Sequence, residues 1–262
     1  MSPASIPAMN APAPNRATLF FLYHEVRSGN SNYSYVIESE HFQQHLDLFA
    51  FVRTTDDGKL KPEVTFDDGH VSNHDIAAPL LASHGIAATF FITVGWTATK
   101  PGYMGWNELR ALKDAGHTIG AHGWSHTLLT HLNDSDLQRE LSQSRLTLED
   151  KLGTPIITMS LPGGRQNARV LAACRAAGYA HVFTSVPKPE PVPLVAVVGR
   201  MNVLAEMRPE WLAKVLDPAT GILASMERKQ RIKDVAKSFL GDHLYERLWA
   251  IVNRREKDAP AA

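Results

Sequence analysis

Residues 63–94 read EVTFDDGHVSNHDIAAPLLASHGIAATFFITV, and their pattern decides the class of fold. Residues 63–66 are typical of a short buried strand, and residues 72–84 of a helix that stops at Gly85. Residues 87–94 form a second strand, rich in β-branched and aromatic side chains. Because parallel strands need a crossover connection, this stretch predicts a β–α–β unit.

The same alternation continues on both sides of this unit. Strand-like runs are found at 17–23, 117–121, 156–161, 180–184 and 194–198, and helical runs at 41–51, 107–115, 135–152 and 168–177. A series of at least six strands separated by helices predicts an α/β domain, either barrel-like or doubly wound. From Pro209 onward the pattern is purely helical, with charged amphipathic stretches at 227–237 and 242–253. We expect these to form a helical cap; the alternative is a surface for a membrane or a partner helix.

The composition excludes two broad classes of protein. The chain has 262 residues, and 27 Lys+Arg against 27 Asp+Glu give no net charge, so no nucleic-acid partner is expected. The single cysteine, Cys174, cannot form an internal disulfide, and its alanine-rich surroundings predict a small buried residue rather than a nucleophile.

The N-terminal residues 1–16 are rich in proline, alanine and serine. They lack the basic and then apolar order of a signal peptide. No stretch approaches the roughly 18 uncharged apolar residues that a transmembrane helix needs. We therefore expect a flexible N-terminal arm, no transmembrane segment and a cytoplasmic location.

Two neighbouring carboxylates, Asp67 and Asp68, directly follow the predicted strand at 63–66. Adjacent strand residues point to opposite faces, so both can enter one site only where the strand ends and turns, and Gly69 supplies that turn. Side by side, the two carboxylates repel each other unless a cation or a proton lies between them. The alternative is that they merely cap the helix that begins at Ser72.

A pair of histidines, His122 and His126, follows the predicted strand at 117–121. Their spacing predicts that both imidazoles lie on one side of a helical turn, where they can share a metal ion. Together with an aspartate at the end of another strand, they would supply three protein ligands. Three ligands leave a position for water, which is typical of a catalytic metal site.

Three short motifs occur in order along the chain: Thr65-Phe66-Asp67-Asp68-Gly69, His122-x-x-x-His126 and Leu161-Pro162-Gly163-Gly164. In this order they resemble the first three motifs of the polysaccharide deacetylases (carbohydrate esterase family 4, the NodB-homology domain). The resemblance implies a distorted (β/α) barrel over residues 17–204, with its site at the C-terminal ends of the strands. Residues 205–262 would form a C-terminal helical extension packed on the barrel.

The resemblance also implies a role for each motif residue. Asp67 would be the general base, and Asp68, His122 and His126 would hold a divalent metal, most often zinc, with nickel, cobalt or manganese as alternatives. The implied reaction is hydrolysis of an N- or O-acetyl group on a carbohydrate, so an acetylated carbohydrate is the expected partner.

Substrate contacts are expected from two further sets of residues. Backbone N–H groups near Leu161, Pro162 and Gly163 would hold the oxyanion, although Pro162 has no N–H to give. Trp106 and Trp124 stand where family members place aromatic walls against a sugar ring, with core packing as the alternative.

The chain departs from the family pattern at several positions. The third motif usually begins with an arginine that orients the base, and here that position is Ser160. Arg165 and Arg200 are the candidates to replace it, and Arg200 is also a candidate for substrate contact. The second motif usually has Ser or Thr where this chain has Gly123, and the tryptophan of the fourth motif is missing.

The fifth motif of the family, Leu-x-His near the C-terminus, is also absent, but Leu22-Tyr23-His24 ends the first predicted strand. A branch of the family, the poly-N-acetylglucosamine deacetylases, is similar in carrying this motif permuted to the N-terminal strand. In a closed barrel the first and last strands are neighbours, so a permuted motif can occupy the same place. We predict that His24 is the general acid; the alternative is a histidine that merely ends a strand.

Two other functions stay open at this point. The same metal site would suit an amidase acting on a small cyclic or linear amide, as in the allantoinase-like relatives of the family. A carbohydrate-binding descendant without activity is the other alternative. The remaining nine histidines have no assigned chemistry, and His45 and His84 are predicted to be packing or surface residues.

Overall fold

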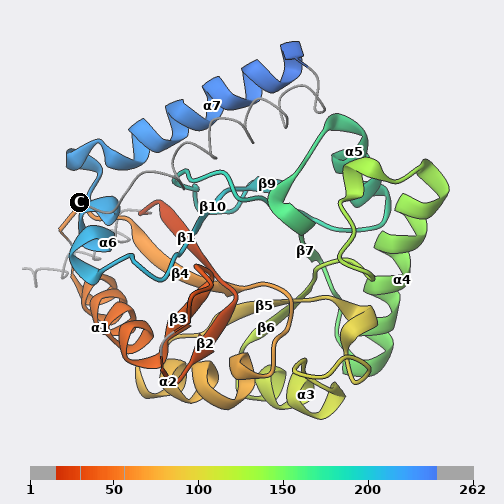
Figure 1. Ribbon diagram of the computed structural model, residues 1–262, viewed down its shortest axis with the longest axis horizontal. Coiled ribbons are helices and arrows are strands. Elements are labelled where there is room, and N and C mark those ends of the chain that lie inside the picture. The colour runs from red at the N-terminus through yellow and green to blue at the C-terminus, as the bar shows by residue number, and fades with distance from the viewer. Residues whose placement is uncertain (1–15, 30, 56, 241–262) are drawn as a thin grey trace, which may run out of the picture.

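The computed structural model describes residues 16–29, 31–55 and 57–240, and its centre is one sheet of eight strands (Figure 1). Every neighbouring pair in this sheet is parallel. The strands in spatial order are β10 (Arg200–Asn202), β1 (Thr18–Tyr23), β4 (Lys61–Phe66), β5 (Ala88–Ile92), β6 (Thr118–Ala121), β7 (Thr158–Ser160), β8 (His181–Phe183) and β9 (Val197–Val198).

The sheet curves into a nearly closed barrel. Its two edge strands, β9 and β10, are consecutive in the chain and separated only by Gly199. The loop before β9 supports this seam, because the backbone of Glu190 exchanges two hydrogen bonds of 2.7 and 2.8 Å with Thr18 of β1. The buried Glu190 carboxylate also accepts the N–H of Gly199. The predicted α/β barrel is confirmed, with the first and last strands side by side.

Helices surround the strands in a ring, as crossover connections of a parallel sheet do (Figure 1). The longest of the five helices in this ring, α4 (Asp134–Leu152), begins at an N-cap where the side chain of Asn133 accepts the N–H of Asp136. It ends at Gly153, which has a φ of 64° in the left-handed region that favours glycine. The ring consists of α1 (Ser39–Thr54), α2 (Ala78–Ser83) with the preceding π-helical turn η1 (Asn73–Ala77), α3 (Trp106–Asp114), α4 (Asp134–Leu152) and α5 (Ala168–Ala176).

Two more helices, α6 (Pro209–Leu216) and α7 (Ile222–Leu240), follow the barrel. Helix α6 contacts α1 and α7, and its last residue, Leu216, accepts a 2.9 Å hydrogen bond from the N–H of Leu60. The stretch 242–253, predicted as an amphipathic helix, lies outside the described residues. Within the part of the chain that the structure describes, no helix is long and apolar enough to span a membrane.

The barrel interior is filled with aromatic side chains. Phe20, Phe91 and Phe183 come from β1, β5 and β8, which are not neighbours in the sheet. The ring centroid of Phe183 nevertheless lies 5.3 Å from that of Phe20 and 4.9 Å from that of Phe91, so the three rings meet across the interior. The alternate residues of β1, Leu19 and Phe21, belong to a separate and larger cluster.

The sequence missed three short strands, each of three residues. One is β10; the other two, β2 (Glu25–Arg27) and β3 (Val36–Glu38), form a separate parallel pair directly after β1. Three residues are too few to show the alternation of polar and apolar side chains that identifies a strand. Both additions bear on the site, because β10 carries Arg200 and β2 follows His24.

Candidate active site

The C-terminal end of β4 brings Asp67 and Asp68 to one edge of the barrel. The N–H of Asp67 still continues the ladder, with a 3.0 Å bond to the carbonyl of Tyr23, but Asp68 already has a φ of 74°. A positive φ is uncommon for a residue other than glycine and concentrates at functional sites. The turn leaves Asp67 almost fully buried, with 3% exposed, and Asp68 partly exposed.

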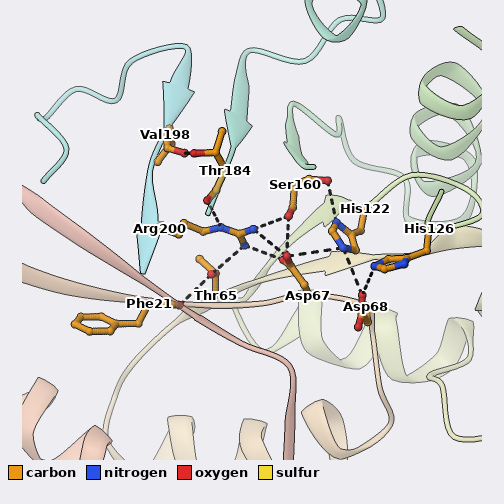
Figure 2. A network of polar contacts seen from close by, with 10 residues as sticks. All are labelled: Phe21, Thr65, Asp67, Asp68, His122, His126, Ser160, Thr184, Val198 and Arg200. Atoms are coloured by element: carbon orange, nitrogen blue, oxygen red, sulfur yellow. Dashed lines mark hydrogen bonds and ion pairs between the residues drawn. The ribbon is translucent and has the colours of Figure 1, made fainter. Parts of the chain in front are cut away.

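Asp67 is held by an arginine and a serine from two other strands (Figure 2). Arg200 donates from Nη1 to Oδ1 at 2.7 Å and from Nη2 to Oδ2 at 2.8 Å, a two-pronged pair. Ser160 donates its hydroxyl to Oδ2 at 2.8 Å and accepts from Nη2 of Arg200 at 2.6 Å. Arg200 is thus the arginine that pairs with the predicted base, and the hydroxyl of Ser160 bonds to both partners of the pair.

The Arg200 pair determines the charge of Asp67. Burial alone would raise the pKa of this carboxyl, but the charge and hydrogen bonds of Arg200, together with the charges of His122 and His24, outweigh it, and the pKa lies below its usual value. The guanidinium itself has no exposed surface and lies over the rings of Phe91 and Phe183, 5.2 and 5.8 Å from their centroids. The predicted substrate contact of Arg200 is therefore wrong, because a fully buried side chain cannot touch a substrate.

Asp68, His122 and His126 converge as a group of three ligand atoms that all lie within 4.8 Å of one another. Oδ1 of Asp68 is 3.4 Å from Nε2 of His122 and 3.2 Å from Nε2 of His126. Oδ1 is buried and makes no hydrogen bond to any described residue. Burial raises the pKa of Asp68, but the two facing imidazoles hold it well below its usual range.

These three residues fit a divalent metal ion. Nδ1 of His122 lies 2.8 Å from the carbonyl oxygen of Ser160, to which it must donate, so Nε2 keeps its lone pair for a ligand bond. Bonds of about 2.1 Å to a tetrahedral zinc would place two ligand atoms about 3.4 Å apart. The observed separations of 3.4 and 3.2 Å agree with that spacing.

The predicted helical turn between the two histidines is wrong. Residues 122–128 contain no helix, and Gly123 and His126 have φ values of 75° and 64°. A loop with two left-handed residues brings the imidazoles together, with ring centroids 5.0 Å apart. The glycine is required here, because its φ would strain the Ser or Thr usual at this position.

His24 lies beside Asp67. Tyr23, the residue before it, is in register with Phe66, the residue before Asp67. Nδ1 of His24 is buried without a hydrogen bond to any described residue, and the ring of Tyr35 lies 4.9 Å away. Burial lowers the pKa of His24, although the charges of Asp67 and Asp68 partly oppose this shift. The first strand therefore delivers a histidine to the same edge as the metal-ligating group.

Comparisons with known proteins bear directly on this geometry. A model of the polysaccharide deacetylase family matches residues 56–182, which contain Asp67, Asp68, His122 and His126. Residues 56–182 of this chain therefore carry a polysaccharide deacetylase domain, as the three sequence motifs predicted. The matched segment ends before Arg200 and begins after His24, so the arginine and the histidine beside the base come from outside it.

Individual members of the family are distant relatives. The chain is 25% identical to the putative polysaccharide deacetylase YxkH of Bacillus subtilis over 63% of its length, and 31% identical to a chitin deacetylase of Pestalotiopsis over 47%. It spans 63% and 40% of the lengths of these two relatives. Among solved structures it resembles the Streptococcus pyogenes deacetylase PplD, with a TM-score of 0.69 and 20% identity. That match covers 77% of this chain and 99% of PplD.

IcaB from Ammonifex degensii gives a similar result. Its TM-score is 0.61 at 22% identity, over 76% of this chain and 96% of IcaB. At such identities the structural matches establish the deacetylase barrel fold and nothing finer.

The third motif departs from the role expected of it. The N–H of Leu161 already donates to the carbonyl of Phe183 at 3.0 Å. Contrary to the prediction, it is therefore not free to hold an oxyanion. Pro162 has no N–H, and it starts the short helix η4 (Pro162–Gly164). The backbone N–H of Gly163 remains the candidate among the three. Trp106 and Trp124 are partly buried and pack against the main hydrophobic cluster, the alternative foreseen for both.

An aromatic rim that the sequence interpretation missed lies beside the metal-ligating group. Trp96, in the short helix η2 (Val94–Trp96), has its ring centroid 5.1 Å from that of His126. The ammonium of Lys100 lies 3.5 Å from the centroid of Trp96 and 4.4 Å from that of Tyr103. Trp96 follows the C-terminal end of β5, so the rule that identified Asp67 and His122 would also have identified it.

Proposed function

We propose that this protein is a metal-dependent hydrolase that removes N-acetyl or O-acetyl groups from a carbohydrate. The observation that carries the proposal is the three-ligand group of Asp68, His122 and His126 beside a carboxylate base that Arg200 keeps charged. The 31% identity to a chitin deacetylase supports a carbohydrate substrate.

Asp68, His122 and His126 would hold the metal. Two imidazoles and one carboxylate suit zinc, and also nickel, cobalt or manganese. When bound, the ion would polarise the acyl carbonyl and make a water molecule more acidic. Asp68 and His126 are partly exposed, so the group faces solvent on the side where a substrate arrives.

Asp67 would act as the general base. A carboxylate has about four lone-pair positions, and the three bonds from Arg200 and Ser160 occupy three of them. The remaining position is on Oδ1, which receives only one of these bonds, so we assign proton acceptance to that atom. The lowered pKa keeps Asp67 ionised and ready to accept the proton of the attacking water.

His24 would act as the general acid that protonates the leaving amine or alcohol. Its place at the edge next to Asp67, from the strand that neighbours both β4 and β10, supports this assignment. The lowered pKa makes the protonated ring a stronger acid but leaves less of it protonated at neutral pH, so the charges of Asp67 and Asp68, which raise the pKa, would favour the role.

The test is acetate release from N-acetylglucosamine oligomers by protein that has been stripped of metal and then reloaded with zinc. We expect release only after reloading, and no release by Asp67→Asn, which keeps the three metal ligands. Ammonia or urea release from a ureide, without acetate release, would instead support the amidase alternative. Stoichiometric metal without hydrolysis of either substrate would contradict the proposal.

A further inference from the structure

Glu140 of α4 contacts the loop that separates the two predicted histidine ligands. Its Oε1 accepts three hydrogen bonds, from the N–H of Trp124 at 2.8 Å, the N–H of Ser125 at 2.5 Å and the hydroxyl of Ser125 at 3.0 Å. The side chain is buried, with 9% exposed. A carboxylate that receives three converging donors makes stronger bonds than a neutral acceptor would.

The opposite side of the same loop is fixed by the backbone after β5. The N–H of Val94 donates to the carbonyl of Gly123 at 3.1 Å, and the N–H of Gly95 donates to the carbonyl of Trp124 at 2.8 Å. Loop 123–126 is thus held between Glu140 and η2. Such double support is needed, because the left-handed φ of His126 persists only where the surroundings determine it.

Gly123 and Glu140 are matched in space. A Cβ added at Gly123 would lie 3.1 Å from Oε1 of Glu140, closer than ordinary van der Waals contact. The carboxylate therefore occupies the space that the Ser or Thr usual at this position would need. The shape of the loop therefore depends both on the glycine at position 123 and on a side chain from α4.

From these contacts we infer that Glu140 is a positioning residue for the metal site. Its carboxylate holds loop 123–126 in the one conformation that directs Nε2 of His126 to Oδ1 of Asp68. Glu140 bonds to Trp124 and Ser125, which lie between the two histidines in the chain, so it acts through His126. The inference rests on the proposed metal site and adds the residue that fixes its geometry.

Three variants of Glu140 separate hydrogen bonding from charge. Glu140→Ala leaves the N–H groups of Trp124 and Ser125 without their acceptor. Glu140→Asp keeps the charge, but its shorter side chain places the carboxylate farther from the loop. Glu140→Gln keeps an oxygen acceptor of the same reach without the charge. Glu149→Ala is the matched control, because Glu149 accepts the N–H of Ile156 at 3.0 Å and so holds the loop after α4. It lies about 13 Å further along the same helix.

The experiment measures zinc affinity by competition with a chromophoric chelator and records the visible spectrum of the cobalt-loaded protein. We expect Glu140→Ala to bind zinc about 10- to 100-fold more weakly, with a changed cobalt spectrum, as loss of a residue that orients a ligand does. Glu140→Asp should weaken binding as well, and Glu140→Gln should weaken it less than Glu140→Ala, because it keeps the acceptor but loses the charge. Glu149→Ala should keep the parent affinity within about threefold.

Parent affinity and spectrum in Glu140→Ala, or in Glu140→Asp should the alanine variant not fold, would overturn the role of Glu140 while leaving the metal site intact. An equal loss in Glu149→Ala would also overturn it, because general destabilisation would then explain the effect. A parent chain that binds no divalent ion would overturn both this inference and the proposed function.

Discussion

His45 is expected to make the stability of this protein fall steeply below neutral pH. The side chain is fully buried in α1, and its Nδ1 lies 3.1 Å from the hydroxyl of Tyr23, the residue before His24. Its Nε2 lies 2.8 Å from the carbonyl oxygen of Met207, just after β10. Since a carbonyl only accepts, Nε2 must carry the proton, and Nδ1 of the neutral ring accepts from Tyr23. The neutral ring therefore ties the end of β1 to the segment between β10 and α6.

Burial lowers the pKa of His45 to about 4, from 6.5 in the unfolded chain. Between these values the unfolded chain binds the proton and the folded protein does not, so protonation favours unfolding. The contribution of His45 is fully present above pH 6.5 and is lost as the pH falls to about 4. A shift of this size corresponds to about 3 kcal/mol in total, of which about 2 kcal/mol is lost between pH 7 and pH 4.5.

The assay is urea unfolding of the parent and of His45→Gln at several pH values, with a chelator present so that metal binding does not contribute. Glutamine cannot be protonated in this pH range. From pH 7 to pH 4.5 the parent should therefore lose about 2 kcal/mol more unfolding free energy than His45→Gln does. His84→Gln is the control of opposite sign, because the backbone of Leu80 and the carboxylate of Asp47 raise the pKa of His84 despite partial burial. If the unfolding free energies of the parent and of His45→Gln differ by an amount that stays constant with pH to within about 0.5 kcal/mol, His45 is not the group that destabilises the protein in acid.

Three further predictions concern the site and the core. His24→Ala should keep its bound metal but turn over about 10²- to 10⁴-fold more slowly, and metal analysis beside acetate release checks this; full turnover with metal retained would refute the acid role. Arg200→Met leaves the carboxylate of Asp67 buried without its cation, so it should lower the unfolding free energy by about 3–5 kcal/mol. Urea unfolding measures this loss, and an unchanged free energy would contradict it. Burial raises the pKa of Cys174 to about 12, so the folded protein should not react with a thiol reagent at neutral pH, whereas the unfolded chain should react at its single cysteine; rapid labelling of the folded state would contradict this.

The sequence predicted the residues that directly follow long strands. Apolar runs in the sequence predict three of these strands, and their C-terminal ends carry His24, Asp67 with Asp68, and His122. Parallel strands bring those ends to one edge of the barrel. The barrel was predictable for the same reason, since six of its eight strands lie in runs with a clear alternation of strand and helix.

Residues that shape the site from elsewhere in the chain were harder to find. Arg200 comes from a three-residue strand, and its pairing with Asp67 depends on the closure of the barrel, which no local pattern encodes. Glu140 lies on a helix whose charged residues look alike in sequence, and only the fold shows that it faces loop 123–126. The expected helical turn was wrong because two left-handed residues bend that loop, a backbone choice that the spacing of two histidines does not reveal.

The measurement that tests the central claim most directly is the metal content of the protein after dialysis against zinc and removal of free ion. We expect one zinc ion per chain for the parent and none for Asp68→Ala. The reason is that Oδ1 of Asp68 lies 3.4 Å from Nε2 of His122 and 3.2 Å from Nε2 of His126. Asp67→Asn should keep the ion, since Asp67 is engaged by Arg200. A parent without stoichiometric zinc, or an Asp68→Ala variant that retains it, would contradict the assignment of Asp68, His122 and His126 as the metal site.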